Sequence, residues 1–259
     1  MKRSVNIVNK IIPYANGLLL LVLWEVLVRV NNLPAYILPG PLQILKTLGE
    51  TLPLLAKHTT STVEEAMLGF GLAIGTAFLV AFVLNQFYWL NQAVYPLLIV
   101  SQTVPIITLA PLFLIWFGWG ILPKILVVIL VCFFPIVISL LNGLNSVDPD
   151  LINLFRSMGA GKMAVFKMVK LPAAMPVFFS GLKISASYSI MAAVIGEWLG
   201  AQQGLGYFMT IAQKSFRVDR VLAAVIIIAG LSLLLVKLIE LAEWLFIPWN
   251  RRKDDWEIM

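Results

Sequence analysis

The sequence has little charge, a single cysteine and a single histidine. Charged residues make up 12% of its 259 residues, and hydrophobic residues make up 60%. A soluble domain is typically about 25% charged. Cys132 has no partner for a disulfide within the chain. Because His58 is the only histidine, a histidine-based metal site or triad within the chain is excluded. Because no nucleophile, base and acid stand in a recognisable pattern, we expect that the chain is not an enzyme and that it binds no metal and no cofactor.

A nucleotide-binding motif is also missing. The pattern G-x-x-x-x-G-K-[ST] does not occur, so the chain is not predicted to bind and hydrolyse ATP itself. The formal net charge of +6 would suggest a nucleic-acid partner in a soluble protein. In a chain this apolar, the cations are better interpreted as signals of membrane topology, and we predict no nucleic-acid partner.

Long apolar runs are what the chain has instead. One helix needs about 20 apolar residues to cross a bilayer core, and barrel strands would alternate over about 10 residues. We therefore predict an all-α, polytopic membrane protein with one domain over residues 1–259. The first run continues without a cleavage site, which favours a retained span over a removed signal peptide. The six predicted spans are 12–30, 63–87, 93–117, 121–141, 176–200 and 221–247.

The distribution of cations predicts the orientation. With six spans both termini lie on one side, and that side receives more lysine and arginine than the other. The positive-inside rule then places both termini and segment 142–175 in the cytoplasm. The richer side holds Lys2, Arg3, Lys10, Arg156, Lys162, Lys167, Lys170, Arg251, Arg252 and Lys253, and the poorer side holds Lys46, Lys57, Lys214, Arg217 and Arg220.

The segment 31–62, on the opposite side, contains a further helical pattern. After Pro41, leucines recur at Leu42, Leu45, Leu48 and Leu52, which is the spacing of one apolar helix face. Two interpretations stay open: a short amphipathic helix on the membrane surface or on neighbouring spans, or a packed connector.

The segment 146–175 interrupts the apolar runs with a basic, amphipathic pattern. Asp148 or Asp150 is placed to cap a first helix, and Pro149 suits its first turn. A bend is expected at Gly159-Ala160-Gly161, followed by a second helix that Leu171-Pro172 stops. Such helices suit a hydrophobic groove on a partner. The candidate docking residues are Leu154, Phe155, Met158 and Phe166.

The spacing in this segment resembles the EAA loop of ABC importer permeases. Gly159, Val169 and Leu171-Pro172 stand at the intervals of that motif, and Asn153-Leu154-Phe155 replace its Glu-Ala-Ala triplet. In the family this loop forms a coupling helix that docks into a cleft on the ATPase subunit. The resemblance therefore implies the same role for 146–175, with Gly159, Leu171 and Pro172 setting its shape.

Other segments resemble the nitrate, sulfonate and taurine branch of that family: "LPGPLQILKTL", "PIITLAPLFLIWFGWG" and "GEWLGAQQGLGYFM". The resemblance implies a type I importer permease fold in a bacterial inner membrane. It further implies two ATPase subunits, a second permease copy, an extracytoplasmic binding protein, and a small organic anion or a pyrimidine precursor of thiamine as the solute. The third segment is more similar to the thiamine-precursor group.

A self-contained secondary transporter or channel is the alternative, and a membrane scaffold is a third possibility. Gradient-driven transporters often carry ionisable groups near the midplane. Segments 66–84 and 94–117 contain no charged residue. That absence favours an external motor.

Several polar residues in the apolar runs are candidates for the translocation path. Glu197 either lines the path or gate, or lies at the interface, solvated or paired with a cation such as Lys214. Ser185 and Ser189 either contact the solute or let helices approach closely. Lys237 and Glu240 are expected to pair on one helix face.

Overall fold

In the computed structural model of the protein, the structure describes residues 7–250, and those residues are mostly helical and contain no strand. The terminal cations Lys2, Arg3, Arg251, Arg252 and Lys253 lie outside the described residues. In chain order the helices are α1 (Ile7–Val30), α2 (Pro41–Gln86), α3 (Tyr88–Ser101), α4 (Ile106–Phe117), α5 (Leu122–Asn145), α6 (Pro149–Ser157), α7 (Lys162–Val165), a π-helical turn (Phe166–Lys170), α8 (Leu171–Trp198), α9 (Leu205–Lys214), α10 (Val218–Phe246) and a 3₁₀ turn (Pro248–Asn250).

The all-α membrane fold is confirmed, but the count of six spans is not confirmed in full. Among the described residues, four helical stretches are long and apolar enough to cross a bilayer: Pro41–Gln86, Leu122–Asn145, Lys162–Trp198 and Val218–Phe246. The pair α3 and α4 would make a fifth. The predicted first span corresponds to α1, whose 24 residues suffice in length, since a crossing takes about 20 residues.

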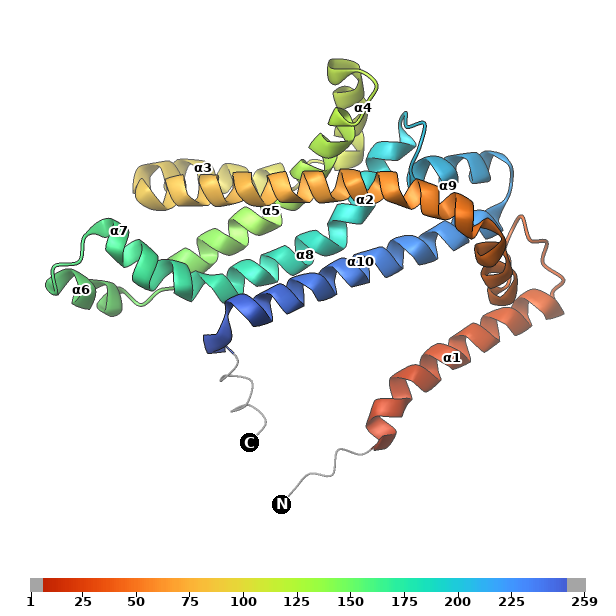
Figure 1. Ribbon diagram of the computed structural model, residues 1–259, viewed down its shortest axis with the longest axis horizontal. Coiled ribbons are helices and arrows are strands. Elements are labelled where there is room, and N and C mark those ends of the chain that lie inside the picture. The colour runs from red at the N-terminus through yellow and green to blue at the C-terminus, as the bar shows by residue number, and fades with distance from the viewer. Residues whose placement is uncertain (1–6, 251–259) are drawn as a thin grey trace.

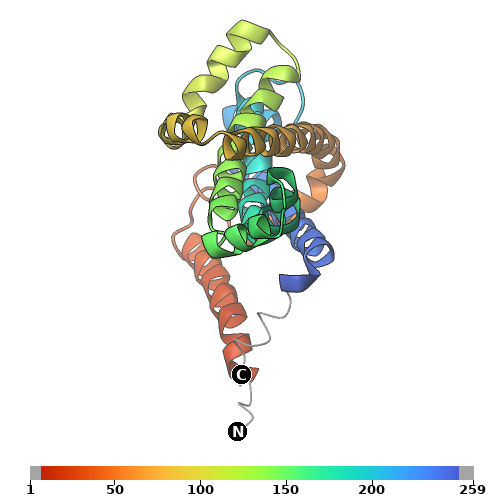
Figure 2. The same cartoon turned by 90° about the vertical axis from the view of Figure 1, so that its left-hand side faces the viewer.

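The predicted third span is a broken helix. Its two parts, α3 and α4, are bent by 98° relative to each other. Pro105 precedes α4, and a proline disfavours the helical conformation in the residue before it. Figure 2 shows the result: α4 and α1 extend from opposite sides of the bundle.

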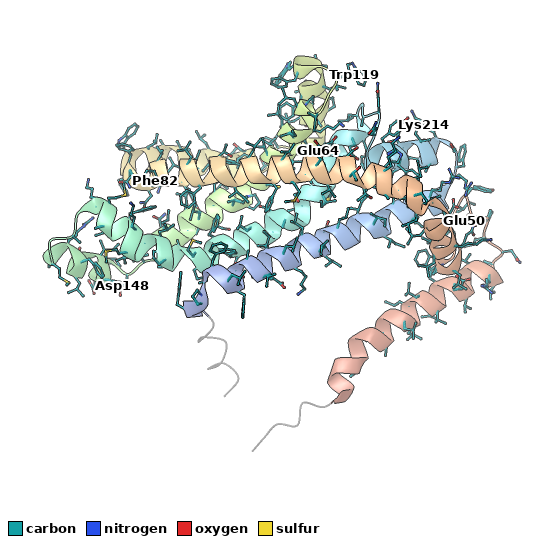
Figure 3. All side chains as sticks on the ribbon, in the orientation of Figure 1. Glu50, Glu64, Phe82, Trp119, Asp148 and Lys214 are labelled. Atoms are coloured by element: carbon teal, nitrogen blue, oxygen red, sulfur yellow. The ribbon has the colours of Figure 1, made fainter. Side chains whose placement is uncertain are left out.

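The helix predicted after Pro41 is the first part of α2 rather than a separate element. Its 46 residues would measure about 69 Å at 1.5 Å per residue, so only part of α2 can span a bilayer core. Pro53 lies inside the helix, and the first part, where Glu50 lies, runs in a different direction from the rest (Figure 3). Leu42, Leu45 and Leu52 are exposed, which leaves this face available to a membrane surface.

The core lies between α2, α5, α8 and α10. Its fully buried side chains include Cys132 and Ile136 on α5 and Ile190 on α8. The Ser185 hydroxyl on α8 donates to the Cys132 carbonyl at 2.9 Å. Small side chains at this contact let the two helices approach closely.

The two ends of the bundle carry different elements. Figure 1 shows α6 and α7 at one end, near the last residues of α10, and α9 with the first part of α2 at the other end. The same end of α10 carries the predicted Lys237–Glu240 pair, confirmed at 2.6 Å, and a second pair from Lys183 on α8 to Glu243 at 2.7 Å. The sites described next lie at these two ends.

Candidate functional site

The helix α6 begins with the capping pattern expected from its sequence. The Asp148 carboxylate accepts a hydrogen bond from the Asp150 N–H at 2.8 Å. Pro149 occupies the first turn, where its missing N–H costs nothing because that group would have no partner within the helix. Of the two carboxylates that the sequence left open, Asp148 is therefore the cap.

The end of α6 is closed by Gly159. The Gly159 N–H donates to the Arg156 carbonyl at 2.9 Å, and the Ala160 N–H donates to the Phe155 carbonyl at 3.0 Å. These two bonds form a Schellman motif. Gly159 has a φ of +85°, a left-handed conformation that glycine adopts without a Cβ penalty. The predicted bend is thus present, and Ala160 and Gly161 connect it to α7.

One side of α6 is apolar and exposed. Leu154 is 56% exposed and Met158 is 76% exposed, while Phe155 is half-buried. Phe166 differs from these residues: it is only 6% exposed, and its ring centroid lies 5.1 Å from that of Phe82 on α2. Phe166 therefore belongs to the core, and its expected place on the exposed docking face is corrected.

Leu171-Pro172 does not stop the second helix. The chain stays helical from α7 through the π-helical turn into α8. The Leu171 N–H donates to the Phe166 carbonyl five residues earlier, which is the bonding of a π-helical turn. This wider turn precedes Pro172, which lacks an N–H and crowds the preceding helical turn. The segment is consequently one continuous rod that leads into the bundle.

At the opposite end of the bundle, side chains from two helices cap the start of α9. The Glu197 carboxylate accepts from the Thr62 hydroxyl and from the Gly206 N–H, each at 2.6 Å. The Thr62 hydroxyl oxygen accepts from the Leu205 N–H at 2.8 Å. The His58 Nδ1 accepts from the Gly204 N–H at 3.2 Å. Three N–H groups at this helix start, which would otherwise lack partners, are thereby satisfied.

The glycines of Gly204-Leu205-Gly206 make this capping possible. Gly204 has a φ of +110°. At Gly206 a Cβ would collide with the Val194 carbonyl and with Glu197. The turn expected from the sequence is present, and its glycines serve a close approach to the Glu197 carboxylate.

A buried ion pair lies beside this cap. The Lys124 ammonium on α5 bonds to the Glu65 carboxylate on α2, and both side chains are largely buried. Glu197 itself is 1% exposed. Its bonds go to Thr62 and Gly206, and no hydrogen bond or ion pair described for it involves Lys214. The carboxylate is thus neither an interfacial, solvated group nor the partner of Lys214.

The two serine candidates lie inside the helix packing. Ser185 and Ser189 are fully buried, and the Ser189 hydroxyl donates to the Ala186 carbonyl at 3.0 Å. Both hydroxyls bond to backbone carbonyls of α5 or α8. This arrangement favours the helix-packing interpretation over contact with a solute.

Comparison with known families matches most of the chain to one protein family. Residues 68–245 match the family "Binding-protein-dependent transport system inner membrane component". The chain belongs to this family. It is therefore an ABC transporter permease, a multi-pass component of an inner membrane.

Relatives in this permease family cover nearly the whole chain. The formylaminopyrimidine transport permease protein ThiX of Halalkalibacterium halodurans is 35% identical over 98% of this chain and 100% of its own length. The putative aliphatic sulfonates transport permease protein SsuC of Bacillus subtilis is 29% identical over 92% and 88%. A structure of the MetNI methionine ABC transporter in inward-facing conformations aligns with a TM-score of 0.51, at 18% identity, over 78% of this chain and 97% of that chain. This last likeness supports the permease fold alone.

The permease has functional candidates that its sequence did not reveal. Thr62, His58, Glu65 and Lys124 join Glu197 in one cluster, although Thr62 and Glu197 are 135 residues apart. A weak signal existed: Glu65 and Lys124 are charged residues near the starts of apolar runs, and such residues default to a functional or paired state. The spacing of these residues in the sequence does not predict which of their side chains are in contact.

Proposed function

We propose that this permease forms the translocation path of a bacterial importer and is driven by a separate ATPase that docks on segment 146–175. Two permease copies, two ATPase subunits and an extracytoplasmic binding protein make up the transporter. Both termini and the docking segment lie in the cytoplasm. The solute is small: an organic anion of the sulfonate, taurine or nitrate kind, or a pyrimidine precursor of thiamine. The names of the relatives, which include formylaminopyrimidine, aliphatic sulfonate and taurine permeases, support this range.

The observation that carries the proposal is the exposed apolar side of α6. Leu151, Leu154 and Met158 are exposed on a short helix that stands at one end of the bundle (Figure 1). An isolated helix of this length is not stable on its own in water, but here both ends are capped by the chain. A preformed amphipathic helix of this kind suits a hydrophobic groove on a partner.

The connection from α6 to the bundle supports a mechanical role. After the Gly159 bend, the helical rod runs from Lys162 to Trp198 without interruption. Phe166 packs edge-on against Phe82 and so ties the base of this rod to α2. Closure of an ATPase dimer would displace the docked α6, and the rod would transmit that displacement to α8. Rigid-body motion of the helices then exposes the path to one side at a time.

The test is recovery of the ATPase with the tagged permease from native membranes. We expect Leu154→Asp/Met158→Asp to abolish this recovery while membrane insertion is retained, because two charges would enter the docking groove. Ile37→Asp is the matched control: Ile37 is exposed to a similar degree but lies between α1 and α2, at the other end of the molecule. This control should recover the ATPase as the unmodified chain does.

Two results would contradict the proposal. Full ATPase recovery by the double variant would remove the docking role of α6. Solute transport by the purified chain in vesicles without ATP would support the alternative, a self-contained secondary transporter.

A further inference from the structure

A recess lies at the end of the bundle that carries α9. Its volume is about 390 Å³, within the range of about 300–1,000 Å³ that small-molecule sites occupy. Four parts of the chain line it: α2, the turn between α4 and α5, the first turn of α5, and the turn between α8 and α9. Figure 3 labels two of the lining residues, Glu64 on α2 and Trp119 after α4. Other lining residues are Ser61, Glu65, Lys124 and Gln203.

The recess carries more negative than positive charge. Two carboxylates, Glu64 and Glu65, and one ammonium, Lys124, line it. The Lys124 ammonium is already bonded to Glu65, whereas the Glu64 side chain is exposed. Among the described residues that line the recess, no second cation balances Glu64. An organic anion would therefore face a carboxylate without a compensating charge, and like charges at close range are unfavourable.

The recess also has a flat aromatic rim. Trp119 is 75% exposed, and its indole lies directly over Gly200, where a Cβ would collide with the ring. This contact with the backbone holds the indole at the edge of the recess. An exposed indole offers a face for offset stacking with another flat ring and attracts a cationic group.

Polar side chains complete the lining. The Ser61 hydroxyl donates to the Gln203 side-chain oxygen at 3.3 Å, a bond that leaves the Gln203 amide N–H₂ as a possible donor. The Glu64 carboxylate is an acceptor only. Acceptors beside an aromatic face match the edge of a ring that carries N–H donors.

We infer that this recess is a solute site that takes a planar, amino-bearing heteroaromatic molecule without net negative charge. The inference rests on the proposed function, because it places the site at the outer mouth of the path and chooses between the two solute classes left open there. It assigns to the permease a contact with the solute in addition to any made by a binding protein. Trp119 stacks on the ring, and Glu64 accepts from its amino group.

The test measures binding to the purified full-length permease in lipid nanodiscs. The probes are 4-aminopyrimidine and ethanesulfonate, and the Kd of each comes from titration followed by saturation-transfer NMR. We expect 4-aminopyrimidine to bind more tightly than ethanesulfonate. Trp119→Ala should weaken its binding about fivefold or more, the size expected for loss of one stacking contact, whereas Trp119→Phe should largely retain it. Glu64→Lys should weaken 4-aminopyrimidine and strengthen ethanesulfonate.

Matched controls separate the recess from the rest of the surface. Trp116→Ala removes another exposed tryptophan, on α4, that does not line the recess, and Glu50→Lys reverses an exposed charge on the first part of α2. Both should leave the two Kd values unchanged. Tighter binding of ethanesulfonate to the unmodified chain, or equal binding of 4-aminopyrimidine to Trp119→Ala, would overturn the inference. Because this assay contains no ATPase, its failure is distinct from failure of the ATPase recovery experiment.

Discussion

The first N–H groups of α6 and of α9 are both satisfied by hydrogen bonds to side chains, but the side chains come from different parts of the chain. The first N–H groups of any helix have no partner within that helix. At α6 the partner is Asp148, whose carboxylate accepts from the N–H of Asp150, two residues later. At α9 the partners His58 and Thr62 come from α2, 146 and 143 residues away, and Glu197 comes from the end of α8.

This difference distinguishes an exposed surface at the α6 end, which is available to a partner, from a buried junction between helices at the α9 end. The end with α6 keeps apolar side chains exposed and needs few contacts with the bundle, as expected of a segment that binds a partner. The end with α9 joins α2, α8 and α9 through buried polar groups, and the adjacent Glu65–Lys124 pair adds α5. Because an unpaired polar group is costly when buried, substitutions at the α9 end should destabilise the fold, and those at the α6 end should weaken partner binding.

The largest effect is expected for Lys124→Met. It leaves the Glu65 carboxylate buried without its cation, and breaking one partner of a buried ion pair costs about 3–5 kcal/mol. The free energy of unfolding, measured by titration with a denaturing detergent, should fall by that amount. Lys237→Met, which removes the exposed pair with Glu240, should change it by less than about 0.5 kcal/mol. The comparison fails if the two variants are equally stable.

A double variant sharpens the same test. Replacing both partners of a buried pair by apolar residues is often neutral. Lys124→Met/Glu65→Met should therefore recover much of the stability that Lys124→Met loses. A double variant less stable than either single variant would show that the two side chains matter for reasons other than their mutual charge.

A somewhat smaller effect is expected for Glu197→Leu. The substitution replaces the carboxylate with an apolar side chain and so removes the acceptor that the Thr62 hydroxyl and the Gly206 N–H share. The Thr62 hydroxyl can still donate to the His58 carbonyl at 3.3 Å, so the Gly206 N–H is the group left unsatisfied, which costs about 1–3 kcal/mol. The loss appears as a lower Tm in detergent. Glu240→Leu, an exposed substitution, is the control and should leave the Tm near that of the unmodified chain, whereas equal Tm values for the two variants would contradict a capping role.

The two ends also differ in how far they could be predicted from the sequence. The caps of α6 and the bend at Gly159 depend on residues a few positions apart, so local patterns predicted them. The contacts of Glu197 and Lys124 depend on how helices from distant parts of the chain pack, and no local pattern reports that. The break between α3 and α4 and the fusion of two predicted elements into α2 were missed for a related reason. Apolar composition predicts burial, but it does not fix the direction of a helix around Pro105 or Pro53.

Gly206→Ala probes the packing of the α9 end without removing a polar group. A Cβ at this position would collide with the Val194 carbonyl and Glu197, and forcing extra volume into a packed site typically costs about 1–3 kcal/mol. Gly230→Ala on α10 is the control, because a Cβ there meets nothing within 4 Å and alanine favours a helix over glycine. We expect a lower Tm for Gly206→Ala only. The reverse order would mean that the cap tolerates displacement.

The smallest effect on stability is expected for Gly159→Ala, at the α6 end. The left-handed conformation at φ +85° costs a residue with a Cβ about 1–2 kcal/mol, but the strain falls on a short exposed bend that can shift without opening the core. Gly161→Ala is matched to it, since Gly161 has a φ of −71° and open space around it. Both variants should keep the Tm of the unmodified chain, while ATPase recovery should fall for Gly159→Ala alone, because α6 would leave its docking orientation. If Gly159→Ala lowers the Tm as much as Gly206→Ala does, the bend is part of the folded core, and the contrast between the two ends does not hold.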